Sequence, residues 1–242
     1  MNRRISRWDA IATDQSLHVS RLHLEMRKVR ISHENWSAPA IEYLAEGATL
    51  IRRFAEPDAN SIISEILTIA LKSQFRTMKT PSGKSMSVEM TNCGKYGWIS
   101  DHFGYRYTET DPLTGGAWPR MPESFIDLVQ RAATLIGFSS YQPDVCLINH
   151  YQPGAAMGLH RDSDERDFSQ PIVSVSIGLP ISFRLGGLTR AGRTVGTQLR
   201  HGDVLVLHGV SRRAFHGVGK LRNGVHPLTG SARYNLTFRV SQ

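Results

Sequence analysis

Apolar residues recur at helical spacing in two stretches of the chain, each preceded by a proline. The first stretch follows Pro57, where Asp58 or Asn60 can cap a helix, and the second follows Pro122 and ends near Gly137. The apolar positions are Ile62, Ile63, Ile66, Leu67 and Ala70 in the first and Phe125, Leu128, Val129, Ala132 and Ile136 in the second. This pattern predicts two amphipathic helices.

The rest of the chain has the pattern of strands, hairpins and loops. Residues 78–119 are rich in Thr, Gly, Ser, Tyr and Trp, which predicts hairpins and loops. After Asp144 the runs VCLINHY, IVSVSIGLPISF, DVLVLHG and YNLTFRV follow one another, separated by Gly, Pro and Asp. Short strands without intervening helices predict an antiparallel sandwich or barrel, so the fold class is α+β.

The last strand carries opposite chemistry on its two faces, because alternate residues of a strand point to opposite sides. One face is apolar, with Tyr234, Leu236, Phe238 and Val240, and the other is polar, with Arg233, Asn235, Thr237 and Arg239. In the run 145–151, Asn149 and Tyr151 share a face with Val145 and Leu147. If both polar faces line one barrel, the two arginines suit a small dicarboxylate; the alternative is an ordinary half-exposed strand.

Composition limits the classes of protein that fit. The chain has 242 residues, a formal net charge of +8 and two cysteines, Cys93 and Cys146, outside any metal-ligand motif. We expect one domain with an N-terminal extension over residues 1–45, in a reducing compartment such as the cytoplasm. No apolar run is long enough for a membrane span, and no apolar segment follows the basic N-terminus as in a secretory signal. The positive charge favours a polyanionic partner such as nucleic acid.

A candidate metal site lies in the stretch GLHRDSDERD, residues 158–167. On extended backbone His160 and Asp162 point the same way, and two histidines with one carboxylate form the facial triad of non-haem Fe(II) oxygenases. The candidates for the third ligand are His201, His208, His216 and His226, of which His216 in RRAFHGVG is favoured. The alternatives are a solvated charged loop and a structural histidine.

A second His-x-Asp shows how weak this signal is alone. His201-Gly-Asp203 directly precedes the apolar run DVLVLHG, so we interpret it as a turn in which Asp203 accepts hydrogen bonds from nearby backbone.

Five stretches of the sequence together resemble a known protein family. The stretches CLINHYQPGAAMGLHRDSDE, PIVSVSIGLPISFRLGGL, HGDVLVLHGVSRRAFHGV and RYNLTFR resemble the AlkB-type Fe(II)/2-oxoglutarate-dependent dioxygenases, as does TPSGKSMSVEMTNCGKYGWISDHFGYRYTETDP, in their bacterial DNA alkylation-repair branch. The resemblance covers roughly residues 45–240. It implies a dioxygenase domain over residues 46–242, with N-terminal helices, a β-hairpin nucleotide-recognition lid at about 78–120 and a double-stranded β-helix (jelly-roll) core at about 140–240.

The resemblance also implies a role for individual residues. Fe(II) would be held by His160, Asp162 and His216, and 2-oxoglutarate by Asn149, Tyr151, Arg233, Asn235 and Arg239. Arg233, Asn149 and Tyr151 would take its distal carboxylate, with Arg239 and Asn235 nearer the metal.

The substrate side of the site is implied in the same way. Trp98 would stack on a flipped-out base opposite His160, Asp164 would read the exocyclic amine, and Tyr105 and Arg190 would lie beside the nucleic acid. The alternative for Trp98 is a hydrophobic anchor of the lid. Thr80, Met90 and Glu165 line up with the same region, although Glu165 otherwise has the pattern of solvated charge, like Arg166 and Asp167.

The activity implied is direct-reversal repair of 1-methyladenine and 3-methylcytosine by a monomeric enzyme. It consumes O2 and 2-oxoglutarate and releases formaldehyde, succinate and CO2, acting on alkylated single- or double-stranded DNA, with RNA as a further substrate. Two other functions stay open on the sequence: the same chemistry on tRNA or a protein side chain, and a non-catalytic jelly-roll binding module.

Overall fold

The computed structural model describes residues 40–242, and the statements below concern those residues. The helices are α2 (Ala59–Lys72), α3 (Glu123–Thr134) and the short 3-10 helix η2 (Gly209–Arg213). The strands are β1 (Ile41–Ala45), β2 (Ala48–Ile51), β3 (Arg76–Lys79), β4 (Ser85–Gly94), β5 (Gly97–Asp101), β6 (Gly104–Thr108), β7 (Val145–Tyr151), β8 (Met157–His160), β9 (Ile172–Gly178), β10 (Ile181–Leu185), β11 (Val195–Leu199), β12 (Val204–Leu207), β13 (His216–Val218) and β14 (Arg233–Arg239). No helix in this part of the chain is long and apolar enough to cross a membrane.

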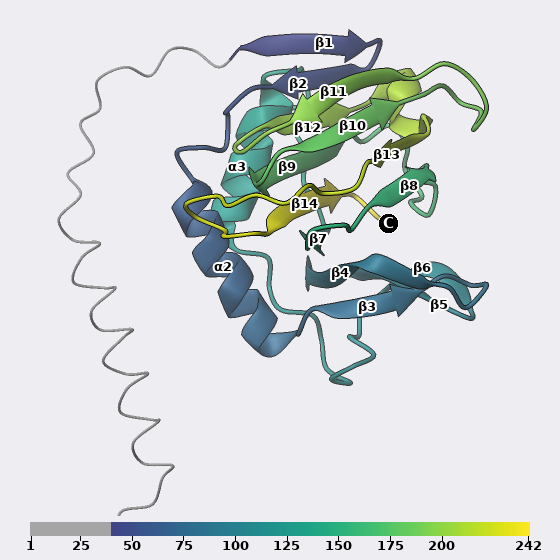
Figure 1. The fold of residues 1–242 in the computed structure, drawn as a ribbon. Helices are drawn as coiled ribbons and strands as arrows, with labels where there is room; N and C mark the ends of the chain where they lie inside the picture. The colour runs from purple at the N-terminus through teal and green to yellow at the C-terminus, as the bar shows by residue number, and fades with distance from the viewer. Residues whose placement is uncertain (1–39) are drawn as a thin grey trace, which may run out of the picture. The chain divides into compact units, whose positions relative to one another are not determined.

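The strands form two large antiparallel sheets and one separate hairpin (Figure 1). The larger sheet has the order β1-β2-β12-β9-β14-β7-β4-β3, and the smaller has the order β11-β10-β13-β8. The hairpin of β5 and β6 is hydrogen-bonded to neither. Two antiparallel sheets packed face to face form a jelly roll, which confirms the predicted fold class.

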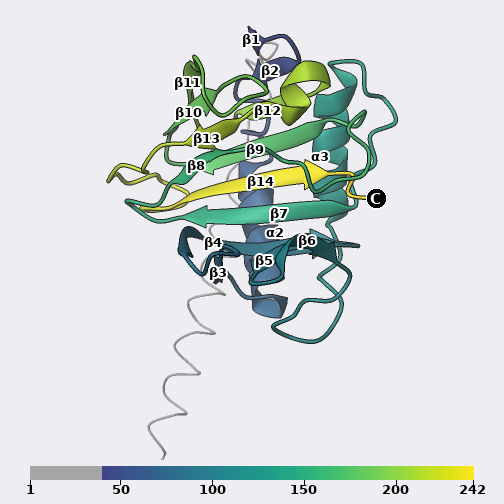
Figure 2. The ribbon, with the colours of Figure 1, turned by 90° about the vertical axis from the view of Figure 1, so that its right-hand side faces the viewer.

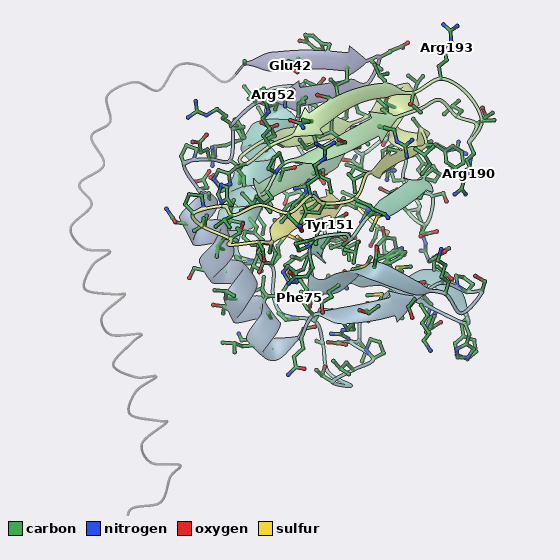
Figure 3. All side chains as sticks on the ribbon, viewed as in Figure 1. Glu42, Arg52, Phe75, Tyr151, Arg190 and Arg193 are labelled. Carbon is green, nitrogen blue, oxygen red and sulfur yellow. The ribbon has the colours of Figure 1, made fainter. Side chains whose placement is uncertain are left out.

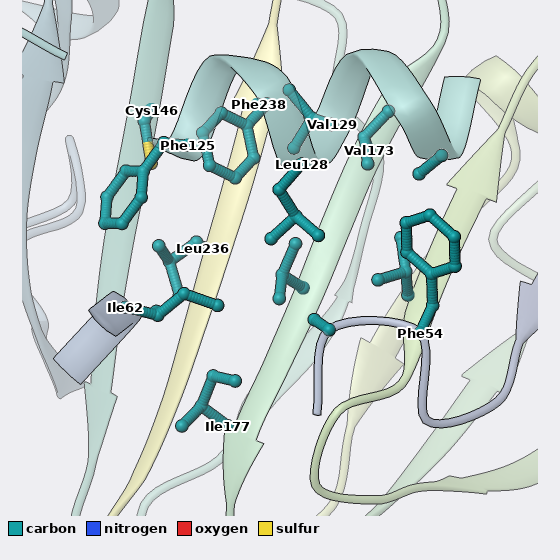
Figure 4. Packing of buried hydrophobic residues seen from close by; sticks show 14 of the residues in the cluster. Phe54, Ile62, Phe125, Leu128, Val129, Cys146, Val173, Ile177, Leu236 and Phe238 are labelled. Atoms are coloured by element: carbon teal, nitrogen blue, oxygen red, sulfur yellow. The ribbon is translucent and has the colours of Figure 1, made fainter. Parts of the chain in front are cut away.

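The helices cover one face of the larger sheet, and Figure 2 shows α2 and α3 behind β9, β14 and β7. The apolar side chains predicted for both helices pack on that face with alternate residues of the strands. Phe125 of α3 meets Phe238 of β14 edge to face, with ring centroids 6.0 Å apart, and Ile62 of α2 lies beside Leu236 (Figure 4). Both helix predictions are therefore confirmed.

A second apolar cluster fills the space between the two sheets. It joins residues of the larger sheet, such as Leu147 and Leu205, to residues of the smaller sheet, such as Phe183 and Leu185. Because each central strand of the larger sheet lies between the two clusters, its alternate residues separate into a helix-facing row and an inner row. On β14 the helix-facing row is the apolar one, so the inner row is the one that carries the two arginines.

The ends of the helices differ in detail from the prediction. Asp58 occupies the N-cap position of α2, but its side chain makes no capping hydrogen bond and pairs instead with Arg131 of α3 at 2.9 Å. Gly137 lies just past α3 with φ +94°, a conformation that favours glycine, and its N–H donates to the carbonyl of Thr134.

The segment around residues 78–120 is divided between two parts of the fold. Its strand β4 pairs with β7 inside the larger sheet, in the register that brings Cys93 opposite Cys146. Only β5 and β6 form the free hairpin. At the other edge of the same sheet, β1 pairs with β2, although its residues fall within the N-terminal extension predicted for 1–45. The remainder of that extension, up to residue 39, lies outside the described residues.

The turn predicted at His201-Gly-Asp203 is confirmed. The Asp203 carboxylate is buried and accepts hydrogen bonds from the backbone N–H groups of Arg200 at 2.8 Å and Arg53 at 3.1 Å. It also pairs with the Arg52 guanidinium at 2.7 Å. His201 accepts the N–H of Gly178 through Nδ1, so both residues serve the turn.

Replacing this buried carboxylate tests its structural role. We expect Asp203→Asn to lower the free energy of unfolding by about 3 kcal/mol, because Arg52 loses its buried counter-charge and two backbone donors lose a charged acceptor. Urea unfolding measures the change. Asp127→Asn removes an exposed carboxylate that pairs with Arg131 one helical turn away, and should change stability by no more than about 0.5 kcal/mol. Equal effects of the two variants would contradict this role.

Candidate active site

Two strands of the smaller sheet and the loop after β8 bring together His160, Asp162 and His216. His160 ends β8, His216 begins β13, and the two residues are paired across the sheet. One ligand atom from each of the three side chains lies within 4.8 Å of the others. Nε2 of His160 is 4.0 Å and Nε2 of His216 is 3.8 Å from the Asp162 carboxylate. The third ligand favoured from the sequence is therefore the one that the fold brings to the pair.

Backbone carbonyls fix the orientation of both imidazoles. Nδ1 of His160 is 2.9 Å from the carbonyl of Gly158, and Nδ1 of His216 is 3.0 Å from that of Ala214. A carbonyl can only accept, so each Nδ1 carries the proton and each Nε2 presents a lone pair to the space beside Asp162. This tautomer allows each imidazole to bind a metal ion through Nε2.

The protonation states also suit a divalent cation. Burial by itself would raise the pKa of Asp162, but Arg239 and the two histidines outweigh it and hold this pKa well below its usual range. Burial, with the neighbouring His160, lowers the pKa of His216 to about 4. At neutral pH the group therefore offers the carboxylate of Asp162 and the neutral imidazole of His216. Two histidines with one carboxylate are the donor set of the facial triad with open positions.

The inner face of β14 places a second arginine away from the metal ligands. Arg233 is 2% exposed, and its guanidinium donates to Ser176 Oγ at 3.0 Å and to the carbonyl of Tyr234 at 3.2 Å. Its Nε has no partner, and no carboxylate in residues 40–242 forms an ion pair with it. Burial lowers the pKa of Arg233 to about 10. A buried cation without a counter-ion fits a site for an anionic ligand.

The polar neighbours of Arg233 lie on β7 and β14. Tyr151 is opposite Arg233 and Asn149 is opposite Asn235, so the two polar faces predicted from the alternation lie side by side. Oδ1 of Asn149 is buried without a partner, whereas its Nδ2 donates to Asn235. Asn235 itself donates to Ser174 Oγ at 2.8 Å, so its amide holds Asn149 in place.

Arg239, at the other end of β14, lies beside two carboxylates, and its Nη1 has no hydrogen-bond partner. It donates to Asp162 at 3.0 Å and its Nε lies 3.2 Å from Glu165. Glu165 also pairs with Arg212 at 3.3 Å and accepts a hydrogen bond from the Tyr107 hydroxyl at 2.6 Å.

The prediction of solvated charge at Glu165 was wrong. The residue is 5% exposed, whereas its neighbour Arg166 is exposed as predicted. Nothing in the local pattern separates the two, because the burial of Glu165 depends on Tyr107 and Arg212, which are distant in sequence.

One cavity of about 860 Å³ joins these groups. Its lining includes every residue that the sequence assigned to the metal, to 2-oxoglutarate and to the substrate: His160, Asp162, His216, Asn149, Tyr151, Arg233, Asn235, Arg239, Trp98, Tyr105, Asp164 and Arg190. Figure 3 shows Tyr151 near the centre of the molecule and Arg190 with Arg193 on the loop between β10 and β11. The cavity therefore runs from the buried arginine to an outer rim that carries positive charge.

Aromatic side chains of the hairpin stand at the rim. Trp98 of β5 and Tyr105 of β6 stack with ring centroids 5.6 Å apart and an interplanar angle of 13°. The indole N–H of Trp98 donates to Asp164 at 2.9 Å, a contact that sequence reasoning missed. Trp98 thus faces the cavity from the side opposite the smaller sheet, and a flat group could stack on it.

Known proteins share this chain's sequence and fold over most of its length. A family model, the 2OG-Fe(II) oxygenase superfamily, matches residues 47–239. The alpha-ketoglutarate-dependent dioxygenase AlkB of Escherichia coli (strain K12) is 52% identical over 206 residues, which are 85% of this chain and 94% of that protein. An AlkB homolog of Caulobacter vibrioides (strain NA1000 / CB15N) is 43% identical over 180 residues, 74% of this chain and 80% of that protein. The solved structure of OsALKBH1 matches with a TM-score of 0.73 and 29% identity, over 83% of this chain and 100% of that one.

The three-residue group can be tested by metal binding without turnover. We expect His216→Ala to weaken Mn(II) binding by at least about tenfold, since it removes one of three protein ligands. Calorimetry measures the affinity. His208→Gln is the matched control, because His208 was also a candidate third ligand but packs against Phe138, and it should bind Mn(II) like the unmodified protein. Equal loss in both variants would exclude the assigned triad.

Proposed function

The chain belongs to the 2OG-Fe(II) oxygenase superfamily, in its AlkB-type group, and we propose that it repairs N-alkylated nucleic acid bases by oxidative demethylation. Enzymes of this family use Fe(II), 2-oxoglutarate and O2. The observation that carries the proposal is a single cavity that contains a His-Asp-His group, a buried arginine without a counter-ion and a stacking surface at its rim. A non-catalytic binding module would not need the first two together.

In this proposal His160, Asp162 and His216 hold the Fe(II). Bound iron, with O2 and 2-oxoglutarate, supplies the oxidation that hydroxylates the N-alkyl carbon while the 2-oxoglutarate becomes succinate and CO2. The bond between the hydroxylated carbon and the ring nitrogen then breaks, which releases formaldehyde and restores the unmethylated base. The task of the chain is to orient both substrates around the metal and to limit the access of water.

The distal carboxylate of 2-oxoglutarate is assigned to Arg233, Asn149 and Tyr151, and Nδ2 of Asn149 would donate to it in place of Asn235. The free Nε of Arg233 can donate to it, and the carboxylate supplies the missing counter-charge. Arg239 lies beside Asp162 and so near the metal-proximal carboxylate, where its Nη1 is buried without a partner. Asn235, which lines the same cavity, is assigned with Arg239 to the side of the metal-proximal carboxylate.

The substrate is assigned to the outer half of the cavity. A base must leave the helical stack to reach such a site, and a damaged base does so at lower cost. We assign stacking on the base to Trp98, opposite His160, and reading of the exocyclic amine to Asp164. Methylation at N1 of adenine or N3 of cytosine adds positive charge to the ring, which the Asp164 carboxylate attracts. Tyr105 and Arg190 then face the phosphate backbone.

The net charge of +8 favours a nucleic acid partner of either kind. We propose DNA as the principal substrate, single- or double-stranded, with RNA as a further one, and a monomer acting in the cytoplasm. Free thiols at the buried Cys93 and Cys146 agree with a reducing compartment. The hairpin of β5 and β6 is the part of the lid, predicted at about 78–120, that would cover the base.

A turnover panel tests the function. Oligonucleotides that carry 1-methyladenine or 3-methylcytosine, as single-stranded DNA, duplex DNA and RNA, should release formaldehyde only with Fe(II) and 2-oxoglutarate present. Unmethylated strands and a mixture treated with a chelator are the controls. Absence of formaldehyde from every methylated strand, with succinate still formed, would assign the same chemistry to another substrate.

A second prediction concerns the stacking surface. We expect Trp98→Ala to weaken binding of a methylated oligonucleotide by about tenfold or more, because stacking of one base on an aromatic ring contributes about 1–3 kcal/mol. Trp98→Phe keeps a ring but loses the hydrogen bond to Asp164, and should retain most of the affinity. Fluorescence anisotropy measures both. Loss of affinity in the Phe variant, equal to that in the Ala variant, would mean that the indole N–H matters and stacking does not.

A further inference from the structure

The hairpin of β5 and β6 is held to the rest of the fold by side chains, since neither strand joins a larger sheet. On the side of β4, both ends of the Asn92 amide form hydrogen bonds with the backbone of Trp98, at 3.0 Å each. On the side of β3, Ser100 Oγ donates to the carbonyl of Lys79. The opposite attachment is to the loop that carries the metal ligand Asp162. These contacts with the loop connect the position of the hairpin to the position of Asp162.

Two paired residues of the hairpin, Trp98 and Tyr107, donate hydrogen bonds to two consecutive acidic residues of that loop, Asp164 and Glu165. Trp98 and Tyr107 are directly opposite each other in the hairpin, so their side chains share a face. Trp98 donates to Asp164 at 2.9 Å, and Tyr107 donates to Glu165 at 2.6 Å. The first contact is at the exposed rim of the cavity, whereas Glu165 is 5% exposed.

The buried contact continues to the metal site without interruption. The carboxylate of Glu165 accepts from Tyr107 and lies 3.2 Å from Nε of Arg239 and 3.3 Å from Arg212. Arg239 donates at 3.0 Å to Asp162. Tyr107, Glu165, Arg239 and Asp162 are thus connected by two hydrogen bonds to carboxylates and one ion pair, that of Glu165 with Arg239, in a part of the protein from which water is largely excluded.

We propose that Tyr107 and Glu165 are positioning residues that couple the placement of the hairpin to the placement of Arg239, and through it to the binding of 2-oxoglutarate. The inference rests on the proposed function, because it extends the assignment of Arg239 to the metal-proximal carboxylate. Neither residue touches the reacting atoms. When the hairpin is docked, Tyr107 fixes one oxygen of Glu165, and Glu165 in turn fixes the plane of the Arg239 guanidinium.

The two acids of the loop therefore have separate tasks. Asp164 can exchange its contact with Trp98 for a base, because both lie at the cavity and the pair is exposed. Glu165 cannot change partners as easily, since a buried carboxylate that loses a hydrogen bond bears the cost of desolvation. The hairpin stays attached through Tyr107 while its rim accepts the substrate.

The test uses the full chain without nucleic acid and without turnover. Tyr107→Phe removes one hydroxyl and keeps the ring, so the fold is retained. Two quantities are measured: amide hydrogen exchange of residues 97–108 in the metal-free protein, and the affinity of the Mn(II)-loaded protein for 2-oxoglutarate by calorimetry. Tyr43→Phe, at a tyrosine that is 80% exposed, is the matched control.

We expect Tyr107→Phe to lower the protection of the hairpin by about tenfold, the effect of losing one hydrogen bond to a charged group, and to weaken 2-oxoglutarate binding at least about threefold. Faster exchange with unchanged 2-oxoglutarate affinity would overturn the proposal, because it would mean that Tyr107 only anchors the hairpin. Unchanged exchange would overturn it as well. Tyr43→Phe should alter neither quantity.

Glu165→Gln separates the two halves of the connection. A glutamine oxygen can still accept from Tyr107, but it loses the charge that faces Arg239. We expect hairpin protection close to that of the unmodified protein and weaker 2-oxoglutarate binding. Retained affinity in this variant would contradict the coupling. If the variant does not fold, Tyr107→Phe still decides. Neither hydrogen exchange nor 2-oxoglutarate affinity requires an alkylated base. The two measurements therefore test the coupling even if the enzyme does not demethylate nucleic acid.

Discussion

Two arginines are buried on the inner face of β14, and the arrangement of the site follows from how each is compensated. Burying an unpaired guanidinium is costly, so each needs a partner of opposite charge. Arg239 finds its partners within the chain, in Asp162 and Glu165. Arg233 finds none among the described residues, and in the proposed function a ligand supplies it. One strand would thereby carry a metal-binding end and an anion-binding end, with the two arginines six residues apart.

The same alternation connects this site to stability. The outward residues of β14, Leu236 and Phe238, pack under α2 and α3, and they fix which face of the strand is turned inward. A shift of one residue in register would exchange the two rows and expose the arginines to the helices. The helix-facing core therefore determines the orientation of Arg233 and Arg239, although it contributes no atom to the cavity.

Much of this could be predicted from local pattern. The helical spacing from Phe125 to Ile136 and the alternation around Asn235 are properties of a few neighbouring residues, and both the helices and the polar row are as predicted. The register that puts Asn149 opposite Asn235 is a property of the fold and could not be predicted from the alternation alone. Contacts between segments that are distant in the sequence could not be predicted, because no local pattern indicates them. The burial of Glu165 depends in part on Tyr107, which lies 58 positions earlier in the sequence. The contact of Trp98 with Asp164 depends on how the hairpin packs against the loop after β8.

The central claim is that Arg233 is buried to bind the distal carboxylate of 2-oxoglutarate. The most direct measurement compares 2-oxoglutarate with 2-oxovalerate, which has the same carbon chain and no distal carboxylate, by calorimetry on the Mn(II)-loaded protein and on its Arg233→Met variant. The unmodified protein should bind 2-oxoglutarate at least about 100-fold more tightly, and the variant should lose most of this preference. Equal affinity of the unmodified protein for the two acids would contradict the account.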